Sequence, residues 1–413
     1  MSGPKQMTER AERDAANPGS GSQKIAYAMF GLLLITYVVA VGDRFLVSML
    51  ATDIRGALNL SIPNMFALTT MFTLGLGIGG LPAAALIQRY SRKAVLLTGL
   101  ILLSVATLAF TEATGFWTMF VFIVLQGVGM SFTATSMFAL STSYFSANRV
   151  AALGLVNLSF GLGSLFGHWI IGELRTALGS WEAPMLIFGF IGIGFAILIA
   201  IMVRPWFSEV KPAAKHVVDS GGADTLKNHN SILLSIMSAL YGMVVYGFLG
   251  TYPSYMREVL ELSAADVGGV MLWFGVGGLT SYYGGKLGDK YSQKSVIFIC
   301  ALALAIVTLF LFKTDLSVLI YKVLATLVGV FGAAIVYTNL AGGHVKSLKR
   351  SLTGKGSGMF VTSVYGGAAL GGYSMGLLVD NWSWEFAGQV QISLLSMIVA
   401  FLALGLRTED MSK

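Results

Sequence analysis

The feature that most constrains this chain is a series of twelve apolar runs, each about long enough to cross a bilayer. A helix needs about 20 residues to span the hydrocarbon core. Hydrophobic residues make up 55% of the chain and charged residues 11%, whereas a soluble domain carries about 25% charged residues. We therefore predict an all-α membrane protein with twelve transmembrane helices. The runs cover residues 25–50, 63–87, 95–112, 116–141, 150–174, 183–204, 232–252, 265–287, 295–313, 316–342, 356–379 and 384–406.

A short basic turn occurs twice and divides the chain into similar halves. It covers residues 89–97 and returns, changed but recognisable, at residues 290–298. A turn that recurs about halfway along a membrane chain is typical of internal repeats. We predict two pseudo-symmetric six-helix bundles joined by a cytoplasmic linker and flanked by two cytoplasmic tails, the first of them disordered. In chain order these segments are residues 1–23, 24–204, 205–231, 232–406 and 407–413.

The lysines and arginines predict the orientation. With the N-terminus inside, 21 of the 27 fall in inner segments, and cytoplasmic segments of membrane proteins carry such an excess. Residues 1–23 lack the apolar core of a secretory signal. We expect both termini in the cytoplasm of a protein integral to the bacterial inner (plasma) membrane.

Charges near the outer ends of the runs are interpreted as solvated surface charges: Glu173, Arg175, Glu182, Arg257, Glu258, Asp380 and Glu385.

The net charge of +7 does not indicate a nucleic-acid partner. The basic residues lie in short connections between apolar runs rather than on one face. The single cysteine, Cys300, excludes an intramolecular disulfide and a cysteine-rich metal site, and we expect a buried thiol. The sequence predicts no metal and no other cofactor.

The repeated turn resembles the signature of the major facilitator superfamily, G-x-x-x-D-[RK]-x-G-[RK]-[RK], which lies between helices 2 and 3 and is often echoed between helices 8 and 9. The second copy matches well, whereas Gln88 stands where the first should have an acid. The resemblance covers residues 25–406 and implies the twelve-helix fold, alternating access and a monomer in the lipid bilayer. The positions are Gly285, Asp289, Lys290, Ser292 and Lys294, and earlier Ala84, Gln88, Arg89, Ser91, Arg92 and Lys93.

Two further segments resemble narrower groups of transporters. Residues 41–48 with residues 59–61 resemble helix 1 of the anion:cation symporters and of spinster-type transporters. Both groups usually have arginine and glutamate in helix 4, and the comparable residues 123–130 contain neither. Residues 144–155 resemble loop 4–5 of monocarboxylate and oxalate/formate-type transporters, which favours an organic-anion substrate.

Asp43 and Arg44 are the strongest candidates for transport chemistry. A charge inside a membrane span costs about 2.5–3.5 kcal/mol on insertion scales, so it needs a partner or a function. The helical rise places the pair in the outer part of the first helix. We expect Asp43 to carry the coupling proton and Arg44 to attract an anionic group of the substrate. The alternative is a charge pair at the outer rim, with the arginine reaching water.

His168 is a second candidate for proton coupling. It is the only histidine well inside an apolar run, at a depth similar to that of Asp43. Helices 1 and 5 are neighbours in the superfamily, so a contact between the two side chains is possible. Such a contact would place titration in the physiological range. A structural histidine with satisfied hydrogen bonds is the alternative.

Polar and aromatic residues inside the helices are candidates for substrate binding. In the superfamily, helices 1, 4, 7 and 10 line the path, and rings with a hydroxyl suit an amphipathic guest. Buried amides need partners, so Gln126 contacts either the substrate or a neighbouring helix. For the tyrosines, packing or a place in the interfacial belt is the alternative. The candidates are Tyr37, Gln126, Tyr241, Tyr246, Tyr337, Asn339 and Tyr365.

The two basic turns are candidates for gating. Their cations can meet helix carboxyl ends, where the helix dipole favours positive charge, and such contacts can hold one access state. The alternative is that they only anchor the orientation. Because the second copy keeps its acid, we expect the stronger latch around Asp289. The candidates are Arg89, Arg92, Lys93, Gly285, Asp289, Lys290 and Lys294.

These features favour a secondary active transporter that imports a small organic anion by proton symport. The runner-up is a proton-driven antiporter that exports an amphipathic compound, drug or lipid. No Walker-type phosphate loop occurs, which argues against direct use of ATP. A receptor, a scaffold or an intramembrane enzyme is the alternative of a different class. An enzyme would need paired catalytic groups inside the membrane, and the sequence offers none, so we predict no catalytic residue.

Overall fold

The structure is a computed structural model that describes residues 20–145, 149–209, 221–349 and 352–411. Within these ranges it is built from helices, with one isolated β-bridge between Ala223 and Leu348. Most of the predicted tail at residues 1–23 and the middle of the predicted linker lie outside the described residues. So do residues 146–148, in the segment that resembles loop 4–5, and residues 412–413 of the second tail.

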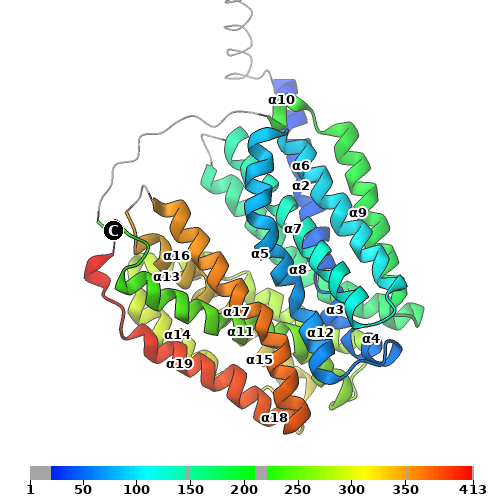
Figure 1. Ribbon diagram of the computed structural model, residues 1–413, viewed down its shortest axis with the longest axis vertical. Coiled ribbons are helices and arrows are strands. Elements are labelled where there is room, and N and C mark those ends of the chain that lie inside the picture. Colours follow the sequence, from blue (N-terminus) through cyan, green and yellow to red (C-terminus); the bar gives the residue numbers. More distant parts are fainter. Residues whose placement is uncertain (1–19, 146–148, 210–220, 350–351, 412–413) are drawn as a thin grey trace, which may run out of the picture.

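Long helices make up most of the described part of the first half (Figure 1). Serine side chains begin two of them: the Ser61 hydroxyl accepts from the amide of Asn64, and the Ser91 hydroxyl accepts from the amide of Ala94. Such caps satisfy amides that have no partner inside the helix. The long helices are α2 (Ser20–Asp43), α5 (Ile62–Arg89), α6 (Arg92–Ala109), α7 (Phe116–Tyr144), α8 (Arg149–Leu178) and α9 (Glu182–Met202). Shorter elements are α3 (Leu46–Met49), α4 (Ala51–Ala57), η1 (Phe110–Glu112) and α10 (Pro205–Ser208).

The second half contains more interrupted helices. Two π-helical segments, η2 (Gly329–Val336) and η4 (Gly388–Leu394), each continue directly from one α-helix into the next. The helices before and after η2 are α15 (Val318–Val328) and α16 (Tyr337–Lys346); those around η4 are α18 (Trp384–Ala387) and α19 (Leu395–Ala403). The other elements are α11 (His229–Glu258), α12 (Ala264–Gly278), α13 (Ser281–Lys290), α14 (Gln293–Thr308), α17 (Thr353–Asn381) and η5 (Thr408–Asp410).

Nine helices among the described residues are long and apolar enough to cross a membrane. The three other predicted runs are also helical. One is divided between α12 and α13, one is the shorter apolar helix α14, and one is the glycine-rich α17. The predicted all-α membrane class is therefore confirmed, although nine rather than twelve helices meet the length and hydropathy requirement of a span.

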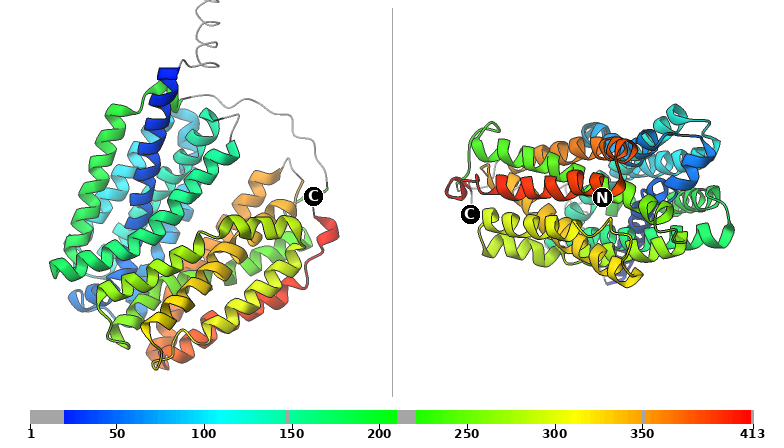
Figure 2. Two further views of the ribbon diagram at one scale, coloured as in Figure 1. Left: turned by 180° about the vertical axis from the view of Figure 1, so that it is seen from behind. Right: turned by 90° about the horizontal axis from the view of Figure 1, so that it is seen from below.

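The two bundles lie close at one end of the molecule and diverge at the other (Figures 1 and 2). We call the divergent end, where α2 begins and α19 ends, the terminal face. The opposite end, which includes α4 and α18, is the distal face. Toward the distal face, α5 packs against α17 and α8 packs against α12, so each pair joins the two halves.

Glycine permits these helices to approach closely. A Cβ atom on Gly372 of α17 would lie 1.8 Å from the carbonyl oxygen of Phe66 in α5. A Cβ atom on Gly172 of α8 would lie 2.3 Å from the carbonyl oxygen of Ala264 in α12. Small residues let membrane helices pack backbone to backbone. These contacts close the space between the halves toward the distal face.

The end of the predicted linker is tied to the second bundle. The Ala223 amide donates to the Ser347 carbonyl at 3.1 Å, and the Lys349 amide donates to the Ala223 carbonyl at 3.1 Å. Asp224 also forms an ion pair with Lys349. Gly222 adopts a φ of +79°, which an L-residue with a side chain rarely adopts. The stretch after residue 220 therefore forms a clasp on the end of α16.

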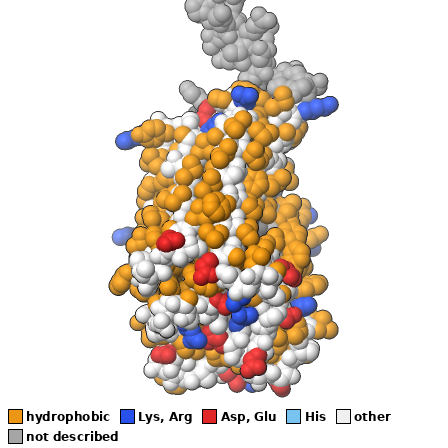
Figure 3. Space-filling model, turned by 90° about the vertical axis from the view of Figure 1, so that its right-hand side faces the viewer, with side chains coloured by type: hydrophobic (Ala, Val, Ile, Leu, Met, Phe, Trp, Pro, Cys, Tyr) orange, Lys and Arg blue, Asp and Glu red, His pale blue; other side chains and the backbone are white. Residues whose placement is uncertain are grey.

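Apolar side chains cover the flank of the first bundle, and most charges on this side lie toward the distal end (Figure 3). Helix α9 exposes Phe190, Ile197 and Ile201. A helix surface of this kind is expected to face lipid. Cys300 is buried in α14, as predicted.

Candidate functional site

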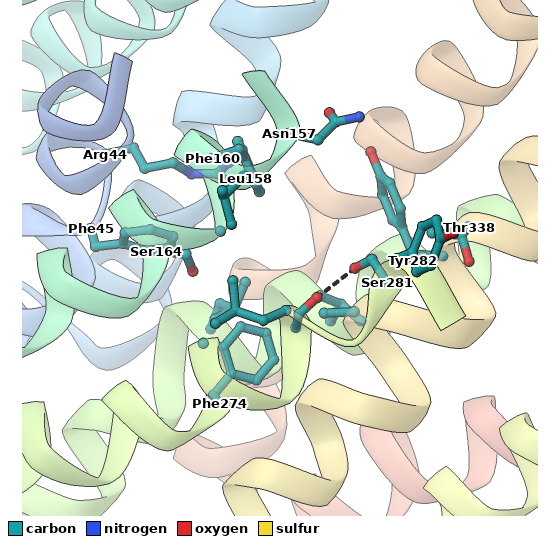
Figure 4. Close-up of a pocket in the computed structure, with 18 of the residues that line it drawn as sticks. Arg44, Phe45, Asn157, Leu158, Phe160, Ser164, Phe274, Ser281, Tyr282 and Thr338 are labelled. Carbon is teal, nitrogen blue, oxygen red and sulfur yellow. Dashed lines mark hydrogen bonds between the residues drawn. The ribbon is translucent and has the colours of Figure 1, made fainter. Parts of the chain in front are cut away.

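A cavity of about 510 Å³ lies between the two bundles (Figure 4). Helix α8 forms one wall, and α11, α12, α13, η2 and α16 form the other. Its lining is mostly apolar and includes Phe160, Leu249 and Phe274. Concave, largely apolar sites with a few polar groups are typical of small-molecule binding.

The first membrane helix is interrupted beside this cavity. Helix α2 ends at Asp43 and α3 begins at Leu46, and the Phe45 amide donates to the Gly42 carbonyl at 3.1 Å. The two charged residues at the interruption have separate surroundings. Arg44 lines the cavity, whereas Asp43 is buried against helices α6 and α7.

Arg44 is surrounded by aromatic rings. Its guanidinium carbon lies 5.0–5.6 Å from the centres of four rings, which belong to Phe45, Phe72, Phe160 and Tyr246. Among the described residues, no carboxylate forms a salt bridge with Arg44, and no other charged side chain lines the cavity. The cation is therefore stabilised by rings and keeps its capacity to bind an anion.

Asp43 is 1% exposed and has uncharged partners. The Thr107 hydroxyl of α6 lies 2.8 and 3.0 Å from the two carboxyl oxygens. The Gln126 amide nitrogen of α7 lies 3.5 Å from Asp43 Oδ1 and 3.1 Å from Thr107 Oγ1. Gln126 thus contacts neighbouring helices, and it is absent from the cavity lining described above.

His168 is fully buried but does not reach Asp43. Its Nδ1 atom donates to the Ser164 carbonyl at 2.6 Å, and its ring centre lies 4.0 Å from that of Phe45. Nε2 has no hydrogen-bond partner among the described residues. The contact between His168 and Asp43 that the sequence suggested is therefore not formed in this structure.

The predicted substrate residues separate into two groups. Tyr241, Tyr246 and Tyr337 line the cavity, whereas Tyr37, Gln126, Asn339 and Tyr365 do not belong to its lining. Asn339 instead donates to the carbonyls of Gly284 and Ile335, so it joins α16 to α13 and η2. The Tyr365 ring packs 5.7 Å from that of Tyr246.

The sequence analysis missed the contribution of α8, α12 and α13 to the cavity. Asn157 and Phe160 of α8 lie on one wall, and Tyr282 of α13 lies on the other (Figure 4). The only signal in the sequence was the row of glycines in these helices, such as Gly161 and Gly163 of α8, which close packing of helices also explains. Glycine also suits a position where the backbone approaches a ligand closely.

The first basic turn is held by its own bundle. Lys93 Nζ donates to the carbonyls of Ala200 and Val203 at 2.7 Å each, at the carboxyl end of α9. Glu209 accepts from the backbone amides of Arg92 and Lys93 at the start of α6. Both arrangements follow the helix dipole. Glu209 thus supplies an acid at a turn where Gln88 replaces the signature aspartate.

The second basic turn makes an ion pair within the second bundle. Lys346 Nζ lies 3.0 Å from Asp289 Oδ1 and 3.2 Å from the Gly288 carbonyl. Lys290 lies over the Tyr291 ring. The other candidates lie at the two turns: Arg89 is exposed, and Gly285 and Lys294 are half-buried. The contacts described here stay within one bundle, as expected where the bundles diverge.

Two charges interpreted as solvated, Arg257 and Glu258, are instead paired across the halves. Arg257 lies 3.7 Å from Asp53, and Glu258 lies 3.3 Å from Arg55. Arg175 also pairs with Asp53, at 2.8 Å. The interpretation was wrong for Arg175 as well as for Arg257 and Glu258, because folding brings all three beside α4: Arg175 from α8 of the same half, and the other two from the end of α11.

A model of the Major Facilitator Superfamily matches residues 33–372 and 234–413 of the chain. The chain belongs to this superfamily. The resemblance drawn from the repeated turn is thereby confirmed, and the protein is an integral membrane transporter of that family.

The individual relatives have names of different kinds. The chain is 24% identical over 301 residues to the hexuronate transporter of Bacillus subtilis (strain 168). The aligned region covers 66% of this chain and 69% of that protein. It is 23% identical over 310 residues to the class B tetracycline resistance protein of Escherichia coli, with 72% and 75% covered. A solved bacterial homologue of the human lysosomal transporter spinster, in an inward-facing and occupied conformation, shares the fold with a TM-score of 0.77 and 15% identity, over 94% of this chain and 98% of that one.

Proposed function

We propose that this superfamily member is a proton-coupled transporter of an organic anion that works by alternating access. One observation carries the proposal: Arg44 is the single charged side chain in the described lining of the cavity between the halves, and it has no carboxylate partner there. An anion bound at Arg44 would contact both bundles, because Tyr246 of α11 lies 5.4 Å from the guanidinium.

The lining favours an anion that carries an apolar part. The hydroxyl of Ser281 donates to the Gly278 carbonyl at the end of α12, and that of Thr338 donates to the Ala334 carbonyl, so neither is a free donor. Phe160, Leu249 and Phe274 offer apolar surface instead. The Tyr241 hydroxyl is a lining group without a partner among the described residues, but a polyhydroxylated sugar acid needs more such groups, and each buried polar group left unpaired costs about 1–3 kcal/mol.

Asp43 is the proposed proton carrier. It has hydrogen-bond partners but no cation among the described residues, and a buried carboxylate without a cation is costly. Protonation removes that cost, so the surroundings favour a group that gains and loses a proton. Because Arg44 is the next residue, a change at Asp43 acts on the same interruption of the first helix that presents Arg44 to the cavity.

The charge distribution supports the proposed placement. The terminal face carries the basic turns, and an excess of basic residues marks the cytoplasmic side. The cavity would then open to the cytoplasm in the state described here. We propose a monomer in the bacterial inner membrane.

Uptake into liposomes tests the proposal. Purified protein is reconstituted, a pH gradient is imposed, and accumulation of aromatic carboxylates, fatty carboxylates and sugar acids is measured. We expect accumulation of an apolar carboxylate that a protonophore abolishes. Equal accumulation with and without the gradient, for every compound, would remove the proton coupling.

Replacement Asp43→Asn tests the proton carrier. The amide keeps an acceptor for Thr107 but cannot exchange a proton, so we expect loss of gradient-driven accumulation while exchange across the membrane is partly retained. Asp380→Asn removes an exposed acid of α17 and serves as the control. If Asp43→Asn accumulates substrate as the unmodified protein does, the proton site lies elsewhere, and His168→Gln is the next variant.

The apolar lining also favours a second candidate, proton-driven export of an amphipathic compound, and a tetracycline resistance protein is among the relatives. A thermal-shift screen separates the two, because a bound ligand stabilises the folded state. Stabilisation by carboxylates supports the anion transporter. Stabilisation by neutral or cationic amphiphiles alone supports the exporter.

A further inference from the structure

A group of charged residues joins the two halves at the distal face. Helix α4 contributes Asp53 and Arg55 from the first half, and the end of α11 contributes Arg257 and Glu258 from the second. Arg55 lies 3.3 Å from Glu258, and Arg257 lies 3.7 Å from Asp53. Each half therefore supplies one acid and one base, and each acid meets the base of the other half.

Two neighbouring residues hold the acids of this group in place. Arg175 of α8 lies 2.8 Å from Asp53, within the first half. The Thr52 hydroxyl donates to Glu258 at 3.2 Å across the halves. Both carboxylates thus have a second partner that orients them, and a fixed geometry strengthens an ion pair because less side-chain freedom is lost.

The burial of this group differs from that of an ordinary surface pair. The side chains of Asp53 and Glu258 are 14% and 17% exposed. Lys313 and Glu385 form an ion pair within the second half, and their side chains are 43% and 45% exposed. Partly buried charges are screened less by solvent and salt than exposed ones. Of these two groups, the buried one connects the two halves and the exposed one does not.

We propose that Asp53, Arg55, Arg257 and Glu258 form a distal latch that stabilises the state closed at this face. The latch lies at the same end as the close backbone contacts of α5 with α17 and of α8 with α12. Separation of the halves at this end breaks both inter-half pairs, whereas the Arg175–Asp53 pair stays within the first half. The latch does not depend on the nature of the substrate or of the coupling ion.

Exchange of the charges tests the latch. Arg55→Glu places two acids together, and Glu258→Arg places two bases together, while the double variant restores an opposite pair. The distance between the halves is measured in a background in which Cys300 is replaced by alanine. Thr114 and Asp315, which are exposed on the distal side of the first and second halves, are each replaced by a spin-labelled cysteine. Double electron–electron resonance without substrate then gives the distance between the two labels.

We expect each single variant to raise the ratio of distal-open to distal-closed molecules by about threefold to fivefold, since partly buried pairs contribute modestly and like charges repel. The double variant is expected to return the ratio toward that of the unmodified protein. Lys313→Glu, the matched control, should leave it unchanged. The latch is refuted if the single variants leave the distance distribution unaltered, or if the double variant adds their effects rather than reversing them.

Raised ionic strength provides a second reading on the unmodified protein. High salt screens the latch and should increase the distal-open fraction, with a smaller increase in the double alanine variant of Arg55 and Glu258. An equal response in both proteins would show that salt acts elsewhere and would count against the latch. Because both tests measure distances without substrate, failure of the proposed transport activity does not affect them.

Discussion

Replacing Arg44 by alanine is expected to weaken the binding of an organic anion by roughly 10- to 100-fold, since a hydrogen bond to a charged group contributes about 1.5–3 kcal/mol. Arg44 is the one cation in the described cavity lining, so no neighbouring side chain there can take its place. Titration calorimetry with the carboxylate that gives the largest thermal shift measures the affinity. The four rings around Arg44 should remain packed, so the loss should be in affinity rather than in fold.

Two further variants separate the charge from its geometry. Arg44→Lys keeps the charge but loses the planar fork of donors, and we expect an intermediate affinity. Arg407→Ala removes an exposed cation from the terminal face and is the control for net charge. Normal anion binding by Arg44→Ala would remove the anion site from the cavity and favour export of an amphipathic compound.

A bulky residue at Gly372 is expected to prevent closure at the distal face. A Cβ atom there would lie 1.8 Å from the Phe66 carbonyl oxygen, so Gly372→Val can fit only if α17 moves away from α5. Overpacking costs about 1–3 kcal/mol, which corresponds to a shift of roughly 5- to 150-fold toward the distal-open state. The spin-label pair on the distal side measures the shift, and transport should fall with it.

Glycines of the same helix provide controls for this variant. A Cβ atom on Gly366 would meet nothing within 4 Å, so Gly366→Ala should change neither distance nor transport. Gly376→Ala is a milder test at the same contact, because its Cβ atom would lie 2.6 Å from the Pro63 Cα atom. An unchanged distance distribution in both Gly372→Val and Gly376→Ala would show that these contacts do not control closure.

The sequence was sufficient to predict the class of protein, because long apolar runs and the repeated turn are local features. It also singled out Arg44, because an arginine in a membrane span needs a partner or a function, and the structure places this side chain in the cavity lining. It did not show the different surroundings of Asp43 and Arg44, because these depend on an interruption of the first helix at residues 44–45 that leaves the apolar run unbroken. The partners of Asp43 come from α6 and α7, which are 64 and 83 residues away.

The charges of the distal face were misread for a similar reason. Arg55 and Glu258 are separated by more than 200 residues, and each has the sequence surroundings of an ordinary loop charge. Only the packing of α4 against α11 reveals the pairing. The motif around Asp289 was recognisable from the sequence alone. The sequence did not show that its ion-pair partner, Lys346, lies in the same bundle.

The clasp between Ala223 and the end of α16 has a consequence for how the chain could be divided. The second bundle has its own anchored beginning, because Ala223 and Asp224 are already bound to Ser347 and Lys349 before α11 starts. A split between residues 209 and 221 would leave this clasp with the second bundle and Glu209 with the first. The two halves could then be expressed as separate polypeptides that reassemble in one membrane.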